Sequence, residues 1–432
     1  MATIEQQTIS KISWRLLPLL MISYFIAYLD RVNLGFAGAS MSKDLGFTST
    51  VFGSAAGIFF VAYFLFEVPS NLALERFGAR RWIARIMFSW GLISAAQAWV
   101  GGSTSFNVVR FLLGIAEAGF FPGVIFYITL WFPAAYRARI VGWFMFAIPI
   151  SSVIGSPISG SSLNMDGVAG MHGWQWLFIL EALPALVLTF FVLFYLPDGP
   201  DDAHWLSDEE RSWLKTRLDA ERRNREAHHN ISWKQSLFNW RVISLGFVYM
   251  GITVPLYGLG FFLPQIIKAF GGLGNVEIGF ITAFPYLIGA IAMVLWTRWS
   301  DAKRERKPFL LVSLVCIFAG LVAAAMLNEP VPKMAAVTVA AFGIFTALPV
   351  FWTLPTALLS GTAAAAGIAW INSIGNLGGY IGPTIFGVLK DKMGSDFYGV
   401  LFLGLLSVLA MVLVLIIGHD NKAEHGAANT SS

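Results

Sequence analysis

"LPDGPDDAHWLSDEERSWLKTRLDAERRNREAHHN", residues 196–230, is the longest polar stretch in this chain of 432 residues. Charged side chains fill it, whereas the sequence on both sides is strongly apolar. Six long apolar runs precede this stretch and six follow it. The stretch therefore predicts a chain of two halves that are joined by a polar linker.

A helix is expected inside this linker. Ser207, followed three residues later by Glu210, makes a capping box, in which each side chain satisfies the backbone N–H of the other residue. Trp213, Leu214 and Leu218 then give the helix one apolar face. We expect this amphipathic helix to lie against the cytoplasmic face of the protein.

The apolar runs are each about 20 residues long, which is the length of a helix that crosses a bilayer. They cover residues 12–35, 51–73, 82–101, 106–131, 138–162, 174–196, 241–267, 276–298, 308–327, 334–357, 364–389 and 396–418. Only 12% of the residues are charged, against roughly 25% in a soluble domain. The sequence predicts an all-α membrane protein with twelve transmembrane helices in two pseudo-symmetric six-helix bundles.

Domain boundaries and topology follow from the linker and the basic residues. The expected parts are an N-terminal bundle (1–196), the linker (197–240), a C-terminal bundle (241–418) and a disordered tail (419–432). If both termini lie on the linker side of the membrane, 22 of the 29 Lys and Arg residues lie there too. The positive-inside rule makes that side the cytoplasm.

Two short loops in the two halves resemble each other. Glu75 is followed by Arg76 and Arg80 after the second apolar run, and Asp301 is followed by Arg304 after the eighth. Because an acid precedes a basic cluster at equivalent places, we interpret these residues as gating loops whose ion pairs break when the halves rock. The alternative is that the basic residues only set the topology. Repeated halves are typical of secondary transporters.

A few ionisable residues lie inside the apolar runs, where a charge is costly and indicates a functional site. Asp30 and Arg31 are neighbours in the first run and point about 100° apart, while Arg110 and Glu117 share one face of the fourth helix. We expect the two arginines to bind an organic anion and the two acids to carry a coupled proton. Alternatively, the four residues form ion pairs that only hold these two helices together.

Two further acids in apolar runs are expected to be structural. Glu67 lies near the end of the second run and is interpreted as a helix-end contact. Glu181 lies in the sixth run, after a tryptophan-rich entry, and is interpreted as part of the packing. Buried polar groups often join helices in this way.

The expected mechanism follows from the chemistry of arginine. An arginine stays charged in a membrane cavity and can hold a carboxylate through two hydrogen bonds. Without substrate, Glu117 or Asp30 would pair with an arginine, and protonation of the acid would free that arginine for an anion. Proton and substrate would then favour the same state, which is what coupling requires. The other residues expected to bind the substrate are Tyr63, Tyr257, Asn372 and Asn376. The alternative is that these polar side chains only join helices.

Four stretches resemble motifs of the major facilitator superfamily, and in particular those of its anion:cation symporter family and the tartrate-transporter-like branch. They are DRVNLGFA (30–37), FFVAYFLFEVPSNLALERFGARRW (59–82), RFLLGIAEAGFFPGVIFYITLWFP (110–133) and LPQIIKAF (263–270). The resemblance covers essentially the whole chain apart from its tails. It implies alternating access and symport of an organic anion with protons.

The resemblance also implies roles for individual residues. The anion-binding and proton-coupling positions of the family match Asp30, Arg31, Arg110 and Glu117, and its tyrosine in the second helix matches Tyr63. Two departures are present. Glu75 stands where the loop motif usually has Asp, and Ile148 and Pro149 occupy a stretch in which sugar-acid carriers have an amide. A long sugar acid is therefore less expected than a shorter or more aromatic acid.

We expect a secondary transporter that imports a tartrate-like hydroxy diacid or a related aromatic acid by proton symport. Its partners would be that anion, protons and the lipid bilayer of a bacterial inner membrane, with no nucleic acid, metal or cofactor, and it would act as a monomer. A proton-coupled exporter of the same fold is the alternative, although two buried arginines would repel a cationic drug. A membrane enzyme or sensor is a further alternative, but no nucleophile or metal-ligand motif stands out.

Overall fold

The computed structural model describes residues 3–227, 239–303, 305–358 and 362–417, which form helices and loops without a β-strand. In the first half the helices are α1 (Ile4–Leu45), α2 (Ser49–Phe77), α3 (Ala79–Ala96), α4 (Ser103–Glu117), α5 (Phe120–Trp131), α6 (Ala134–Met145), α7 (Ala147–Ser162) and α8 (Gly173–Tyr195). In the second half they are α11 (Trp240–Lys268), α12 (Asn275–Lys303), α13 (Lys307–Met326), α14 (Pro330–Leu358), α15 (Thr362–Asn376), α16 (Gly378–Met393) and α17 (Asp396–Ile416).

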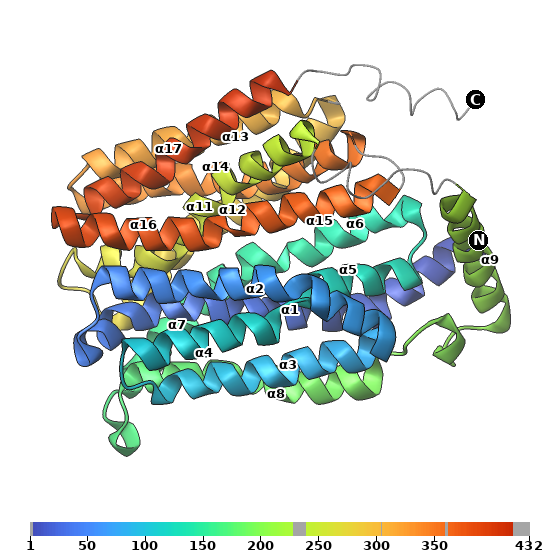
Figure 1. Cartoon of the computed structure of the whole chain (residues 1–432), viewed down its shortest axis with the longest axis horizontal. Helices are drawn as coiled ribbons and strands as arrows, with labels where there is room; N and C mark the ends of the chain where they lie inside the picture. The colour runs from blue at the N-terminus through green and yellow to red at the C-terminus, as the bar shows by residue number, and fades with distance from the viewer. Residues whose placement is uncertain (1–2, 228–238, 304, 359–361, 418–432) are drawn as a thin grey trace.

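Figure 1 shows these helices side by side in two groups, with the linker helix α9 (Asp208–Ala227) across one end. We call this end the linker end and the opposite end the far end. The twelve predicted spans in two bundles are confirmed. Among the described residues, ten of these spans are long and apolar enough to cross a membrane. They are α1, α2, α4 with α5, α6 with α7, α8, α11, α12, α13, α14 and α17. The other two are α3 and the pair α15–α16.

Three of the twelve spans each consist of two helices with a break between them. The breaks fall between α4 and α5, between α6 and α7, and between α15 and α16. At the first break Gly119 has a φ of 87°, which side chains other than glycine rarely adopt, and a Cβ there would collide with Ser70. Near the second break Pro149 has no N–H to donate to the carbonyl of Met145.

The linker helix is confirmed, together with its cap. Ser207 N donates to Glu210 Oε2 (2.8 Å) and Glu210 N donates to Ser207 Oγ (3.2 Å), which is the predicted capping box. Leu214 on the apolar face is fully buried. Lys11 pairs with Glu210 at 2.9 Å, because α1 begins at Ile4 and extends beyond its apolar run to reach α9. The linker helix is therefore fixed to the first half.

The two halves pack closely at the far end and less closely at the linker end. At the far end α2 packs along α16, and α7 packs along α12. Toward the linker end, in contrast, α2 makes few contacts with α15. Gly53 of α2 allows this approach, since a Cβ at this position would collide with the carbonyl of Pro383 in α16. The far end is therefore closed in this conformation.

A carboxylate of the second half caps a helix of the first half at the far end. Asp391, in the last turn of α16 and outside its apolar stretch, accepts hydrogen bonds from the backbone N–H groups of Ser49 (3.0 Å) and Thr50 (2.6 Å) at the start of α2. Partial burial raises the pKa of Asp391, but these hydrogen bonds outweigh it and lower the pKa below its usual value. The charge also faces the positive end of the α2 dipole.

We expect Asp391→Asn to lower the ratio of closed to open far ends by roughly fivefold, because a charged acceptor is lost at a site that water reaches. Since the pKa is lowered in the closed form, this contribution is present above the usual aspartate pKa and is lost only as the pH falls through the lowered value. The contribution of Asp391 to closure should therefore be constant between about pH 6 and 8. The measurement is the distance between spin labels at Lys43 and Lys392 in a Cys316→Ser background. A distance distribution equal to that of the unsubstituted chain would contradict the prediction.

Candidate functional site

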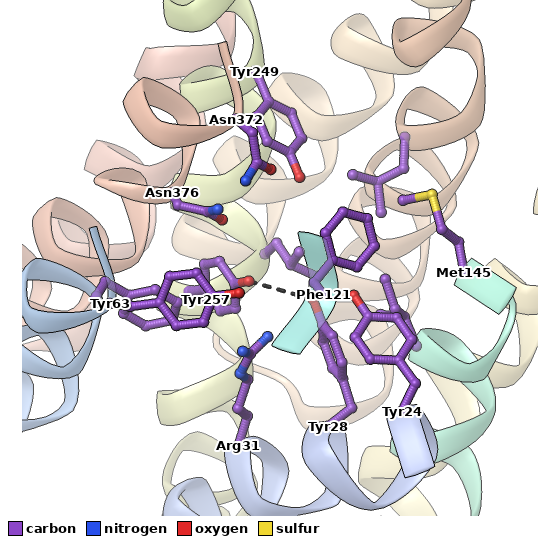
Figure 2. A pocket seen from close by; sticks show the side chains of 14 residues that line it. Tyr24, Tyr28, Arg31, Tyr63, Phe121, Met145, Tyr249, Tyr257, Asn372 and Asn376 are labelled. Carbon is purple, nitrogen blue, oxygen red and sulfur yellow. Dashed lines mark hydrogen bonds between the residues drawn. The ribbon is translucent and has the colours of Figure 1, made fainter. Parts of the chain in front are cut away.

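A pocket lies between the two halves and receives side chains from both (Figure 2). Its walls come from α1, α2, α5, α6 and α7 on one side and from α11, α14 and α15 on the other. Of the residues expected to bind substrate, those that line the pocket are Arg31, Tyr63, Tyr257, Asn372 and Asn376. The pocket is therefore built where the two halves meet.

Arg31 is the only Lys or Arg among the described residues that line the pocket. Its Nη2 donates to Glu117 Oε1, and this ion pair joins α1 to the end of α4. The Arg31 guanidinium also lies 4.8 Å from the ring centre of Tyr28, where a cation–π contact stabilises it. The Arg31 Nε atom has no hydrogen-bond partner among the described residues. The described part of the pocket wall thus holds one cation, and this cation is paired with an acid.

The break in the fourth span determines where Glu117 lies. Glu117 is the last residue of α4, and Gly119 then turns the chain into α5. The Glu117 side chain is almost completely buried, with 3% of its surface exposed. The break therefore places a buried carboxylate at a helix end, beside the pocket cation.

Asp30 points away from the pocket, as the 100° offset from Arg31 predicts. Its carboxylate accepts hydrogen bonds from Trp90 Nε1 (2.5 Å), Ser94 Oγ (3.0 Å) and Asn33 Nδ2 (3.4 Å). The hydrogen bonds from Trp90 and Ser94 hold α1 against α3 inside the first half. A role of Asp30 in proton coupling remains a prediction, and it would have to act from behind the pocket wall.

Arg110 is also buried and does not line the pocket in this conformation. Its Nε donates to the carbonyl of Ala55 (3.3 Å) and its Nη2 to that of Ala56 (3.2 Å), both in α2. The guanidinium lies 5.0 Å from the ring centre of Phe59. Arg110 therefore joins α4 to α2 here, and direct binding of substrate by Arg110 remains a prediction.

Aromatic side chains that the sequence reasoning missed form much of the pocket. Tyr24 and Tyr28 of α1 line it together with Phe60 and Phe121. A signal was present, because residues 24, 28 and 31 are spaced four and three apart and so lie on one helix face. Tyr28 and Tyr257 bring their hydroxyl groups to 3.3 Å and so connect the two halves across the pocket.

Glu67 makes a contact between the halves and not the helix-end contact that we expected. Asn372 Nδ2, in α15, donates to Glu67 Oε1, in α2, at 3.3 Å. Glu181, in contrast, accepts from Ser159 Oγ at 2.7 Å within the first half, in agreement with a structural role. The partner of Glu67 lies 305 residues away in the chain, so no local pattern could have indicated it.

A family model described as "Major Facilitator Superfamily" matches residues 20–383. The chain belongs to the major facilitator superfamily. It is therefore a multi-pass membrane transporter and not an enzyme.

Related proteins agree with this assignment. A protein of Agrobacterium vitis named "Putative tartrate transporter" is 50% identical over 419 residues, which cover 97% of this chain and 93% of that protein. A protein of Acinetobacter baumannii named "Quinolone resistance transporter" is 43% identical over 413 residues and covers 96% and 95% of the two chains. A solved structure of the xylose transporter XylE of E. coli has a TM-score of 0.74 at 14% identity, with 94% and 99% of the chains covered, and thus shares the fold.

The residues that we interpret as gating loops form different ion pairs in the two halves of the chain. In the first half a basic residue of the loop is paired, and in the second half an acid is paired. Arg80 pairs with Asp198, at the start of the linker, at 3.0 Å, and Asp301 pairs with Arg306. Glu75 and Arg76 are exposed and have no ion pair among the described residues, while Arg304 lies outside them. The sequence pattern did not indicate Asp198 as a partner of Arg80, because Asp198 lies after the sixth span and is far from this loop in the chain. Opening and closing of these pairs remains a prediction.

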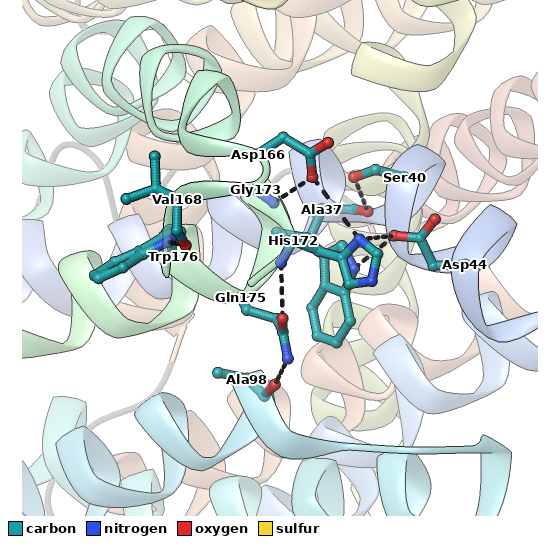
Figure 3. A network of polar contacts seen from close by, with 11 residues as sticks. Ala37, Ser40, Asp44, Ala98, Asp166, Val168, His172, Gly173, Gln175 and Trp176 are labelled. Carbon is teal, nitrogen blue, oxygen red and sulfur yellow. Dashed lines mark hydrogen bonds and ion pairs between the residues drawn. The ribbon is translucent and has the colours of Figure 1, made fainter. Parts of the chain in front are cut away.

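A second polar cluster, at the far end, is structural (Figure 3). His172 Nδ1 lies 3.2 Å from Asp44 Oδ2 and 3.8 Å from Asp166 Oδ1, and Trp174 Nε1 donates to Asp44 at 2.9 Å. These contacts tie the start of α8 to the end of α1. The described residues contain no group of three or more His, Cys, Asp or Glu side chains that could hold a metal ion.

Proposed function

We propose that this transporter imports a small organic carboxylate together with protons by alternating access. The ion pair between Arg31 and Glu117 in the pocket wall is the observation that carries the proposal. Protonation of Glu117 removes its charge and frees the Arg31 guanidinium, which then holds the carboxylate of the substrate in a bidentate manner. Proton and substrate consequently stabilise the same state of the carrier.

The pocket favours a substrate with one carboxyl group and a flat apolar body. Arg31 is its only basic residue among those described, and rings such as those of Tyr24, Phe60 and Phe121 surround it. Aromatic rings stack on such walls at centre distances of about 4.5–7 Å. A tartrate-like hydroxy diacid is the second candidate, because relatives carry that name and the amides of Asn372 and Asn376 supply donors for its other oxygens.

Orientation and location belong to the same proposal. Since most basic residues lie on the linker side, the linker end faces the cytoplasm of a bacterial inner membrane and both termini lie there. The pocket is enclosed by the two halves of one chain, which supports a monomer as the transporting unit. The far end then faces outward and is closed in this conformation.

The test uses the purified full-length protein in liposomes with an inward proton gradient. We expect labelled benzoate or tartrate to accumulate and to leave again when a protonophore removes the gradient. Accumulation of tartrate alone would select the hydroxy diacid. Efflux of a lipophilic cation against its gradient, without uptake of either acid, would contradict import and support the exporter.

A further inference from the structure

Glu67 is a buried acid between the two halves that the transport scheme above does not use. It lies in α2, one helical turn beyond Tyr63 toward the linker end, and 5% of its surface is exposed. Its contact with Asn372 is one of few between α2 and α15. Asn372 also lines the pocket (Figure 2), so Glu67 lies directly behind a pocket residue.

No base compensates this carboxyl group in the described part of the chain. Glu67 belongs to no ion pair there, and its Oε2 atom has no hydrogen-bond partner. The titratable groups that its charge reaches are the phenols of Tyr63, on the same helix, and Tyr249, on α11. From α15 it meets the uncharged side chains of Asn372 and Ser373.

The charged residues of the other helices that pack against α2 are engaged elsewhere or face solvent. On α1 and α4, Arg31 pairs with Glu117, while Arg110 binds carbonyls three turns away. On α1, Asp30 is hydrogen-bonded to α3.

The charged residues of α3 and α16 are also engaged elsewhere or exposed. On α3, Arg80 pairs with Asp198, Arg81 is exposed and Arg85 stacks on Trp82. On α16, Asp391 and Lys390 are bound at the far end, where Lys392 is exposed, and α5 has no charged residue.

A carboxylate is expensive to bury without a partner cation, whereas a neutral carboxylic acid is far less so. In water, a glutamate is ionised at neutral pH. In the structure the contact with α15 covers this buried group, and a separation of α2 from α15 at the linker end would expose it to water. Such a separation would favour the ionised form of Glu67.

We propose that Glu67 is a second proton-carrying residue, which binds a proton when α2 and α15 come together and releases it when they separate at the linker end. The proton binds to the carboxylate and leaves as hydronium through the opened linker end, so no other reactant is needed. The proposal rests on the proton symport proposed above and adds one proton to it. Asn372 contacts Glu67 and also lines the pocket, so the movement that brings α15 onto α2 both buries Glu67 and closes this side of the pocket.

The first experiment does not depend on transport. Infrared spectra of the purified full-length protein and of Glu67→Gln are recorded at neutral pH without substrate and subtracted from each other. The difference should contain the carbonyl band of a neutral carboxylic acid, which the unsubstituted chain has and Glu67→Gln lacks. Glutamine keeps the size of the side chain and an acceptor for Asn372, so folding should be retained, and thermal unfolding checks this. If the spectra of the folded variant and the unsubstituted chain are identical in this region, Glu67 carries no proton and the proposal is wrong.

The second experiment measures protons per substrate in liposomes, with whichever of benzoate or tartrate the unsubstituted chain accumulates. In Glu67→Gln this ratio should fall by one, while exchange without a gradient and the pH dependence of substrate affinity should be kept. Glu329→Gln, an exposed change at the far end, is the matched control and should leave the ratio unchanged. An unchanged ratio in Glu67→Gln, or loss of exchange in that variant, would overturn the proposal. If even the unsubstituted chain transports no acid, the proposed function fails, and the infrared result still decides on Glu67.

Discussion

Arg31→Ala will reduce uptake of the carboxylate by about 100-fold or more. Two hydrogen bonds to a charged group contribute about 3 kcal/mol or more together, and each 1.4 kcal/mol is a factor of ten in binding. Arg31 is the only basic residue lining the described pocket, so no neighbour can replace it. The measurement is the initial rate of proton-driven uptake in liposomes, normalised to the amount of folded protein.

The same substitution also removes the partner of Glu117, and breaking a buried ion pair costs about 3–5 kcal/mol of stability. The double variant Arg31→Ala/Glu117→Gln separates the two effects, because it leaves no unpaired charge. We expect this variant to unfold at nearly the temperature of the unsubstituted chain and still to transport no carboxylate. Arg31→Lys keeps the charge but not the planar fork, and should retain partial uptake. Normal uptake by folded Arg31→Ala would disprove the assigned role of the cation.

Much of the fold could be predicted because the membrane imposes simple lengths on the sequence. A spanning helix needs about 20 apolar residues, and the charged linker then divides the twelve runs equally. The helix in the linker was predictable from a local cap between Ser207 and Glu210. Each of these features depends on residues that are close together in the chain.

The helix breaks could not be predicted in this way. Gly119 has a left-handed conformation and fits against Ser70, which belongs to a different helix. Glycine and proline are common in membrane helices that continue without a break, as Pro157 does inside α7. Whether a helix breaks at a glycine or a proline therefore depends on its packing against other helices, and the sequence pattern alone does not reveal that packing.

The candidate site was predictable in its residue types but only partly in its contacts. Arg31 and Asp30 diverge around α1 as the helical period requires. Arg110 and Glu117 share α4, yet the long side chain of Arg110 reaches backbone carbonyls of α2. Long side chains bind wherever unpaired acceptors lie within reach, so helical spacing places their Cα atoms but not their charged groups.

Glu117→Gln will uncouple one proton from transport while leaving exchange of substrate intact. Glutamine cannot ionise, so Arg31 stays available to the substrate carboxylate at every pH, and substrate affinity should no longer weaken as the pH rises. With a gradient of one pH unit, each coupled proton can support about tenfold accumulation, so the accumulation ratio should fall about tenfold. Equilibrium binding across the pH range and accumulation in liposomes measure the two effects.

The two acids can be distinguished by this pair of measurements. Glu117 touches the pocket cation, so its replacement should change the pH dependence of substrate affinity, whereas Glu67→Gln should change only the proton ratio. Coupling through Glu117 requires that binding of proton and substrate be linked at the same arginine. If Glu117→Gln accumulated substrate to the full extent, with unaltered pH dependence, the ion pair would be structural. The proton would then have to be carried by Asp30 or Glu67 without the help of Arg31.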